Sequence, residues 1–390
     1  MKTITKIICC VLFLLSGTIN AQENDICLGK ENIPTIDLSQ EQNRHTIIAQ
    51  GTSEIYQGHP YSVMFPDKKT IFVAWNINHG GNAGPMAKSV DGGLSWQRLD
   101  NKMPPEYFEH INCPSIFRLV NQEGNEFLWV FTSQPMFSRI VSEDKGETWT
   151  EQESLGFPNV MAFSSIVPKN PGIQDGKYIG FFHRRVANNG EILNKEPNVP
   201  GSLQVVISET NDAGWTWSEP RTIAALPGKD LCEPFAFWSP NQKEICCLMR
   251  ENQHKGCSMV SFSNDKGETW SLPTETSWGL TGDRHIGTYL PDGRLFFAFR
   301  DQAHNSSTRG HFVGWVGTYD DIKNRKTGQY RIKLLHSFAG SDCGYPGVHL
   351  LSDGTIIALT YIKYKNDNQK HSVVLTRFKI CETDDLFKNN

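Results

Sequence analysis

The chain has 390 residues and a formal net charge of −4, and 38% of its residues are hydrophobic. This length allows two or three ordinary domains or one large β architecture. The acidic balance and the absence of a basic run exclude a typical nucleic-acid-binding surface, so we expect no nucleic-acid partner. Aromatic residues make up 11% of the chain, which favours strands over helical bundles.

Residues 1–21 have the layout of a secretory signal peptide. Lys2 and Lys6 precede an apolar run from Ile7 to Leu15, and Ala21 ends the segment as a small residue. The run is too short to span a bilayer, and no later segment is apolar over 18 residues. We therefore expect export to the periplasm or the extracellular space, without a membrane span.

The sequence has ten cysteines, and an exported protein can oxidise some of them. Cys27 and Cys381 lie near opposite ends of the exported chain, so a disulfide between them is one possibility. No Cys-x-x-Cys pair occurs, and Cys246 and Cys247 are adjacent. The spacing typical of zinc ligands is thus missing, and neither a metal nor another cofactor is expected.

A short motif, Ser-x-Asp-x-Gly-x-Ser/Thr-Trp, recurs along the chain. Its copies are Ser89–Trp96, Ser142–Trp149, Ser263–Trp270 and, with two extra residues, Ser208–Trp217. The Asp and Ser side chains can bind the N–H groups of a turn, Gly provides a positive φ, and Trp anchors the returning strand. We expect these Asp boxes to be structural hairpin turns, with Thr318–Asp321 as an eroded fifth copy.

A second repeat consists of an apolar strand, a polar turn and another apolar strand. Its six copies are Tyr61–Trp75, Ser115–Phe131, Met161–Phe182, Phe235–Met249, Gly287–Phe299 and Gly347–Tyr361. Six hairpins give about 60 residues per unit, the size of a four-stranded propeller blade. No long segment has the spacing of an amphipathic helix. The predicted fold is all-β, a six-bladed β-propeller formed as one domain by residues 22–390.

Two segments far apart in the sequence should complete the sixth blade. The strand around Thr46–Gln50 is expected to lie beside His371–Lys379. The residues just before each first hairpin strand should then face one another across the central channel. In four blades such a residue is followed by proline: His59, Cys113, Glu233 and Tyr345. In the fifth blade the corresponding residue is Arg284 or His285.

The pairing of a glutamate with a tyrosine indicates nucleophilic catalysis, because a carboxylate can accept the phenolic proton and make the tyrosine a nucleophile. Together with the Asp boxes and six blades, this pair resembles the sialidase (neuraminidase) superfamily of exo-glycosidases, which use a tyrosine nucleophile. The resemblance covers most of the exported chain. Tyr345 begins a Tyr-Pro-Gly-Val-His-Leu-Leu-Ser-Asp-Gly segment similar to the nucleophile strand, and Glu233 matches the base. Arg250 and Arg309 resemble two of the three arginines that bind the substrate carboxylate.

Two residues of the family pattern are missing. Gly58-His59-Pro60 stands where the family has Arg-Ile-Pro, and the following loop, Asn76–Asn82, has no carboxylate for the acid aspartate. Histidine transfers protons near neutral pH, so His79 is the candidate acid. His59 would help to hold the anionic group, and Arg284 and His285 are further candidates for substrate binding.

The resemblance implies an exported exo-glycosidase that releases a terminal anionic sugar, by default sialic acid, from a glycan or oligosaccharide. Tyr345 would attack the anomeric carbon, Glu233 would accept its proton, and the configuration would be retained. The missing residues leave two alternatives: a hydrolase or lyase acting on another acidic sugar, such as a uronic or ketulosonic acid, and a non-catalytic carbohydrate-binding propeller. The oligomeric state stays open.

Overall fold

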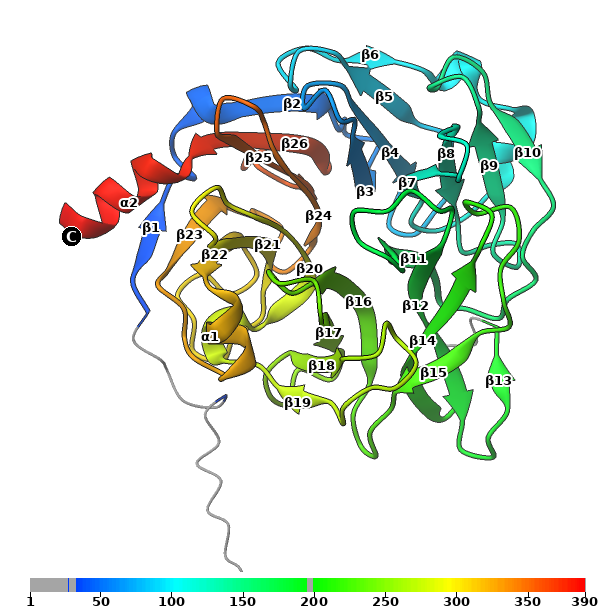
Figure 1. Ribbon diagram of the computed structural model, residues 1–390. Coiled ribbons are helices and arrows are strands. Elements are labelled where there is room, and N and C mark those ends of the chain that lie inside the picture. The colour runs from blue at the N-terminus through cyan, green and yellow to red at the C-terminus, as the bar shows by residue number, and fades with distance from the viewer. Residues whose placement is uncertain (1–26, 28–32, 195–198, 390) are drawn as a thin grey trace, which may run out of the picture.

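The computed structural model describes residue 27 and residues 33–194 and 199–389. The predicted signal peptide lies outside this range. Within it, the strands form six sheets arranged as a ring (Figure 1), which confirms the predicted six-bladed β-propeller. None of the described helices is long and apolar enough to cross a membrane.

Each blade begins with its innermost strand and continues outward through antiparallel neighbours. Blade 1 consists of β3 (Gln57–Met64), β4 (Ile71–Ile77), β5 (Met86–Ser89) and β6 (Gln97–Arg98). Blade 2 consists of β7 (Ser115–Val120), β8 (Glu126–Phe131), β9 (Arg139–Ser142) and β10 (Thr150–Gln152). Blade 3 consists of β11 (Met161–Pro168), β12 (Tyr178–Ala187), β14 (Gly201–Thr210) and β15 (Arg221–Ala224), with β13 (Ile192–Leu193) beside β12.

Blades 4 to 6 follow the same order. Blade 4 consists of β16 (Leu231–Trp238), β17 (Ile245–Glu251), β18 (Met259–Ser263) and β19 (Thr274–Glu275). Blade 5 consists of β20 (Gly282–Tyr289), β21 (Leu295–Asp301), β22 (Phe312–Gly317) and β23 (Tyr330–Leu335). Blade 6 contains β24 (Cys343–Leu350), β25 (Thr355–Ile362) and β26 (Ser372–Lys379). The ring closes as predicted, because β2 (His45–Ala49) pairs antiparallel with β26. An unpredicted strand, β1 (Thr35–Asp37), extends blade 5 by pairing parallel with β23.

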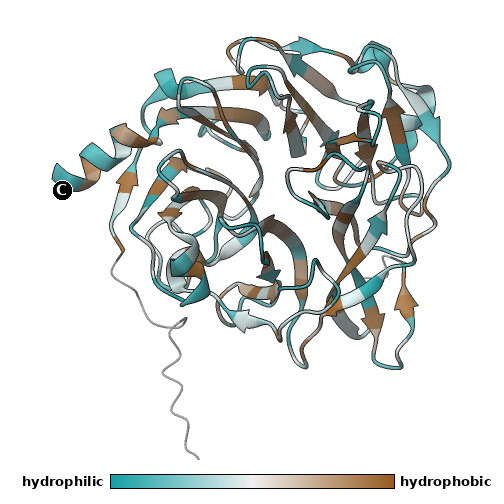
Figure 2. Cartoon of the chain, in the orientation of Figure 1, coloured by the Kyte–Doolittle hydropathy of each residue, from teal (hydrophilic) through white to brown (hydrophobic). Residues whose placement is uncertain are grey.

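The core lies between neighbouring sheets, and the hydrophobic residues are concentrated on the strands, whereas the loops and the short outer strands such as β6 and β10 are mostly hydrophilic (Figure 2). The Asp boxes form turns that place their tryptophans against this core. Trp217, for example, lies 4.4 Å from the ring of Phe163, centroid to centroid. The aromatic content of the sequence therefore serves mainly to fill the space between blades.

The Asp boxes have the geometry that their residues predict. In the second box, Asp144 accepts hydrogen bonds from Ser142 Oγ and from the N–H of Thr148, both at 2.8 Å. The fourth box is more regular than predicted. Thr210 takes the place of the first serine and donates to Asp212 at 2.7 Å, so the two extra residues counted from Ser208 belong to the strand.

Two expectations from the sequence are wrong. The supposed fifth Asp box is a short helix, α1 (Tyr319–Lys323), because Thr318 and Asp321 form a capping box at its start. A second helix, α2 (Ile380–Asn389), follows the last strand. Cys27 forms a disulfide with Cys257, not with Cys381, which is free and exposed on α2. The Cα atoms of Cys27 and Cys257 are 5.2 Å apart, within the range that a disulfide requires.

Candidate active site

The residues predicted to face the channel share an unusual backbone conformation. His59, Cys113, Glu233, Arg284 and Tyr345 have positive φ angles of 37°, 44°, 49°, 57° and 56°. Four of them lie where the pairing register of their innermost strand shifts, in β-bulges of β3, β16, β20 and β24. Left-handed backbone at non-glycine residues costs on the order of 1–3 kcal/mol each and is concentrated at functional sites. A bulge redirects one side chain, here the one aligned by the blade repeat.

Two of these residues form the predicted pair. The Tyr345 phenol donates a hydrogen bond to Glu233 Oε1. Both side chains are buried, with exposed fractions of 9% for Tyr345 and 3% for Glu233. Glu233 also accepts a hydrogen bond from Arg250 Nη1 at 3.2 Å, and its backbone N–H donates to His183 Nδ1 at 3.3 Å. Both side-chain hydrogen bonds, from Tyr345 and from Arg250, thus reach the same carboxylate oxygen, Oε1.

Charge around the pair sets its protonation. Burial alone would raise the pKa of Glu233, but the guanidinium groups of Arg250 and Arg284 outweigh it and lower the pKa to about 2. Burial and the negative charge of Glu233 raise the pKa of Tyr345 well above its usual value. At neutral pH the pair is therefore a carboxylate that accepts from a neutral phenol, the state from which general-base activation of a nucleophile starts.

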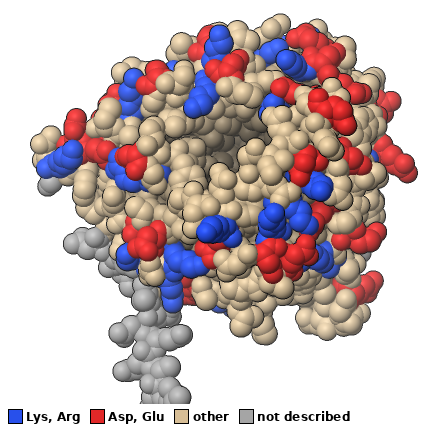
Figure 3. Space-filling model, viewed as in Figure 1, with Lys and Arg blue, Asp and Glu red and all other residues tan. Residues whose placement is uncertain are grey.

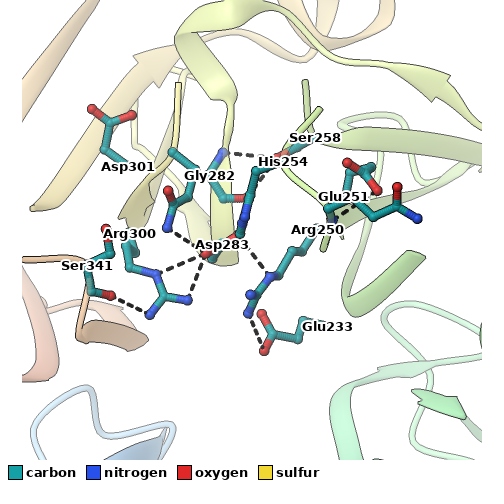
Figure 4. Close-up of polar contacts among 12 residues, drawn as sticks. Glu233, Arg250, Glu251, His254, Ser258, Gly282, Asp283, Arg300, Asp301 and Ser341 are labelled. Carbon is teal, nitrogen blue, oxygen red and sulfur yellow. Dashed lines mark hydrogen bonds and ion pairs between the residues drawn. The ribbon is translucent and has the colours of Figure 1, made fainter. Parts of the chain in front are cut away.

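A buried ion network lies beside the pair (Figure 4). Asp283 on β20 binds Arg250 Nε at 3.0 Å and Arg300 Nη2 at 2.7 Å, so it links the ends of β17 and β21. Arg300 Nη1 also donates to the carbonyls of Ser341 and Cys343 at 2.8 and 2.9 Å. Burial would raise the pKa of Asp283, but the two arginines hold it far below its ordinary value.

Arg300 is absent from the predicted site residues, although the sequence contains a signal for it. In blade 4, Arg250 pairs with Cys232 on the innermost strand, and in blade 5, Arg300 pairs in the same way with Asp283. Arg250-Glu251 and Arg300-Asp301 also end their strands with the same charge pattern. Aligning the second strands as well as the first would have placed both arginines at the channel.

Blade 5 carries three further candidates for substrate binding, Arg284, His285 and Arg309, and the structure gives them different surroundings. Arg284 is buried, donates to Ser164 Oγ at 2.6 Å and lies 5.1 Å from the centre of the Tyr345 ring, so it is the channel-facing residue of this blade. His285 points away from the channel, because its Nε2 lies 2.8 Å from the Leu280 carbonyl and its ring packs on Phe299.

The expectation that Arg309 joins Arg250 is not met. Arg309 is exposed, and its Nη1 donates to the carbonyls of Gln302 and Ala303 at 2.9 and 3.4 Å. Among the described residues, no contact connects Arg309 with Arg250. A short loop that satisfies its own carbonyls with an arginine cannot be distinguished by sequence from one that presents the arginine to a ligand.

The two histidines of blade 1 do come together beside the nucleophile candidate. The His59 ring lies 4.4 Å from the Tyr345 ring and 4.5 Å from the His79 ring. Burial and the neighbouring His79 lower the pKa of His59 to about 3, so His59 is neutral and cannot hold an anion as a cation. Its Nδ1 lies 3.2 Å from Cys113 Sγ. The His79 side chain, in contrast, is 63% exposed.

The carboxylate missing from the blade-1 loop is provided by blade 6. Asp342 Oδ1 lies 3.3 Å from His79 Nδ1 and accepts hydrogen bonds from Tyr56 and Tyr361 at 3.0 and 3.1 Å. On its other side, Oδ2 lies 3.2 Å from His371 Nε2. Burial would raise the pKa of Asp342, but its hydrogen bond with His79, the charge of His371 and the Tyr56 hydroxyl lower it. Asp342 therefore carries its charge beside His79.

The centre of the ring is hollowed in the space-filling view, where uncharged surface borders the hollow and acidic and basic residues lie further out (Figure 3). The buried charged residues of the site, Glu233, Asp283, Arg284 and Arg300, lie on the innermost strands and their neighbours. A Tyr–Glu pair, guanidinium groups and a carboxylate-bound histidine form a set suited to cleaving a glycosidic bond.

Comparisons with known proteins agree with this fold. The chain aligns with a protein from Dyadobacter fermentans of unknown function at 13% identity and a TM-score of 0.59, covering 86% of this chain and 98% of the other. It aligns with an α-L-arabinanase from Penicillium chrysogenum complexed with arabinobiose at 14% identity and a TM-score of 0.57, covering 85% of this chain and 97% of the other. With a sialidase from Trypanosoma rangeli the identity is 14% and the TM-score 0.50, and the alignment covers 86% of this chain and 56% of the other.

At these identities the likeness shows the fold, which sialidases and arabinanases share. No curated protein matches the sequence. The family model described as "BNR repeat-like domain" matches residues 116–358, more than half of the chain. This protein therefore belongs to the BNR repeat-like domain family and has the fold of the sialidase superfamily.

Proposed function

We propose that this protein is a retaining exo-glycosidase in which Tyr345 is the nucleophile and Glu233 its base. The observation that carries the proposal is the buried hydrogen bond from the Tyr345 phenol to the Glu233 carboxylate. As the phenolic oxygen forms a bond to the anomeric carbon, its proton passes to Glu233 and the glycosidic bond breaks. Water then cleaves the glycosyl–tyrosine bond, and Glu233 returns the proton to the phenol.

The leaving oxygen needs a proton, and His79 is the group that we assign to this step. Its exposed side chain can reach a leaving group outside the buried pair. Asp342 Oδ1 lies 3.3 Å from Nδ1, which leaves Nε2 to donate to the leaving oxygen. In the second half of the reaction the same ring, now neutral, accepts a proton from the attacking water.

The sugar is proposed to be anionic, with sialic acid as the default. Arg250, Arg284 and Arg300 face two buried carboxylates, those of Glu233 and Asp283, so the innermost part of the site has an excess of positive charge. A substrate carboxylate would compensate that charge. A uronic or ketulosonic acid would do so as well.

A second candidate is a neutral sugar, favoured by one observation. Asp283 binds both Arg250 and Arg300, and Arg284 donates to Ser164, so each of the three guanidinium groups already has a partner within the protein. The Penicillium fold neighbour, whose structure contains arabinobiose, is an arabinanase. Charge compensation within the protein is what a neutral substrate requires.

Aryl glycosides distinguish these candidates. Purified protein would be assayed on an aryl α-sialoside, an aryl β-glucuronide and an aryl α-L-arabinofuranoside, and the anomer first released would be identified by NMR. Turnover of one of them with retention supports the glycosidase proposal and names the sugar class. Binding of sugars without turnover of any substrate would contradict the enzyme and favour a carbohydrate-binding propeller.

The role of His79 gives a separate prediction. His79→Ala should reduce kcat by about 10²- to 10⁴-fold on a substrate with an alkyl leaving group but much less on a nitrophenyl glycoside, whose leaving group needs no proton. Asn82→Ala, in the same loop, is the control for loop disturbance. Equal losses on both leaving groups would show that His79 is not the acid.

A further inference from the structure

A second pocket lies where blades 5 and 6 meet, apart from the residues described above. Its volume is about 380 Å³, and its lining includes Gln42, His45, His336, Phe338, Tyr364 and Lys365. Side chains from several strands and loops, distant in the sequence, contribute to it. The proposed reaction uses none of them.

The aromatic rings of this pocket are held in fixed positions. Phe338 is 46% exposed, although most large hydrophobic side chains of the protein are buried. The His336 ring packs between the rings of Phe338 and His311, at centroid distances of 4.6 and 4.1 Å. Tyr364 is anchored by a hydrogen bond of 2.9 Å from its hydroxyl to Gln50. Ordered aromatic rings that remain open to solvent are suited to bind a ligand with an apolar face.

The other lining groups are polar. Gln42 offers an amide, His45 and His336 offer imidazoles, and Lys365 offers an exposed ammonium group. An aromatic platform surrounded by amide, imidazole and ammonium groups matches a sugar ring, which has C–H groups on its faces and hydroxyl groups around its edge. An apolar protein segment would leave these polar groups without hydrogen-bond partners.

The pocket is connected with the active site through one loop. The loop from β23 to β24 carries Phe338 at the pocket and Asp342 beside His79. They are four positions apart in the chain, so their Cα atoms are at most about 15 Å apart. Phe338 is tied to blade 6 because its N–H donates to the Lys363 carbonyl at 2.8 Å. A short oligosaccharide can span such a distance.

We infer that this pocket is a second carbohydrate-binding site, which holds a sugar unit of the same glycan several units from the bond that is cleaved. The inference rests on the proposed glycosidase function and adds a substrate class: an oligosaccharide or polysaccharide rather than a disaccharide. Phe338 would lie against the face of the sugar, and His336 and Gln42 would bind its hydroxyl groups.

Affinity electrophoresis in gels containing arabinan, polygalacturonate or polysialic acid tests the inference. The measurements use the Tyr345→Phe background, so that no polymer is degraded. We expect at least one polymer to retard the protein, and Phe338→Ala to weaken that binding roughly fivefold or more. Adding Lys365→Ala to Phe338→Ala should weaken polymer binding further. The matched control is Leu272→Ala, which removes a side chain that is 79% exposed on blade 4.

Kinetics separate this inference from the proposed function. With Tyr345 intact, Phe338→Ala should leave kcat/KM on the aryl glycoside unchanged and raise KM on the polymer. If no aryl glycoside is cleaved but Phe338→Ala still weakens polymer binding, the binding site stands and the glycosidase proposal fails. Failure of all three polymers to retard the protein, or an equal loss in Leu272→Ala, would overturn the inference.

Discussion

Tyr345→Phe should abolish turnover while leaving the fold intact. The substitution removes only the phenolic oxygen, so the ring keeps its contacts with His59 and Arg284. Glu233 keeps its ion pair with Arg250 but has no proton to accept. Because no other nucleophile takes the place of the phenol, we expect kcat to fall by on the order of 10³-fold or more, with a smaller change in KM. Steady-state kinetics on the best aryl glycoside measure both values.

Tyr61→Phe is the matched control for this experiment. Tyr61 is also buried, and its hydroxyl donates to the Ser164 carbonyl at 3.0 Å. Removing that hydroxyl should change kcat only slightly. Glu233→Gln, in contrast, should lower kcat by about 10²- to 10⁴-fold, because an amide cannot take the proton of Tyr345. A Tyr345→Phe variant that keeps a tenth or more of the wild-type kcat would exclude Tyr345 as the nucleophile.

The fold could be predicted because its signals are local and repeated. Each Asp box is determined by side chains two to four residues apart, as the contacts of Asp144 show. The hairpins around them have turn residues between β-rich flanks, and six copies determine the blade count. Thr318–Asp321 starts a helix and not the expected turn, because threonine and aspartate three residues apart cap a helix as readily as they stabilise a turn.

The site could be predicted only in part, because its contacts connect different blades. The blade repeat aligned Glu233 with Tyr345, and the structure joins them. It could not decide between Arg284 and His285, since a bulge determines which of two adjacent side chains faces the channel. Asp342, three residues before Tyr345, cannot be assigned from the blade-1 loop, because its contact with His79 crosses from blade 6 to blade 1.

Asp283 is expected to contribute more to stability than any other charge at the site. It is fully buried between Arg250 and Arg300 and also lies 2.9 Å from His254 Nε2. Asp283→Ala leaves two buried guanidinium groups with less compensation, and loss of one partner of a buried ion pair costs about 3–5 kcal/mol. Urea denaturation at pH 7 measures the loss in the free energy of unfolding, and an unchanged m-value shows that the two unfolding reactions are comparable.

The pH dependence of that loss identifies its origin. The arginines hold the pKa of Asp283 below its value in the unfolded chain, which is about 3.9. The contribution of Asp283 is therefore fully present above about pH 4 and decreases as the pH falls below it. The wild type and Asp283→Ala should differ most at neutral pH and converge in acid, whereas Leu272→Ala, at an exposed position, should follow the wild type throughout. A difference that stays constant down to pH 2 would mean that Asp283 stabilises the protein by packing and not by its charge.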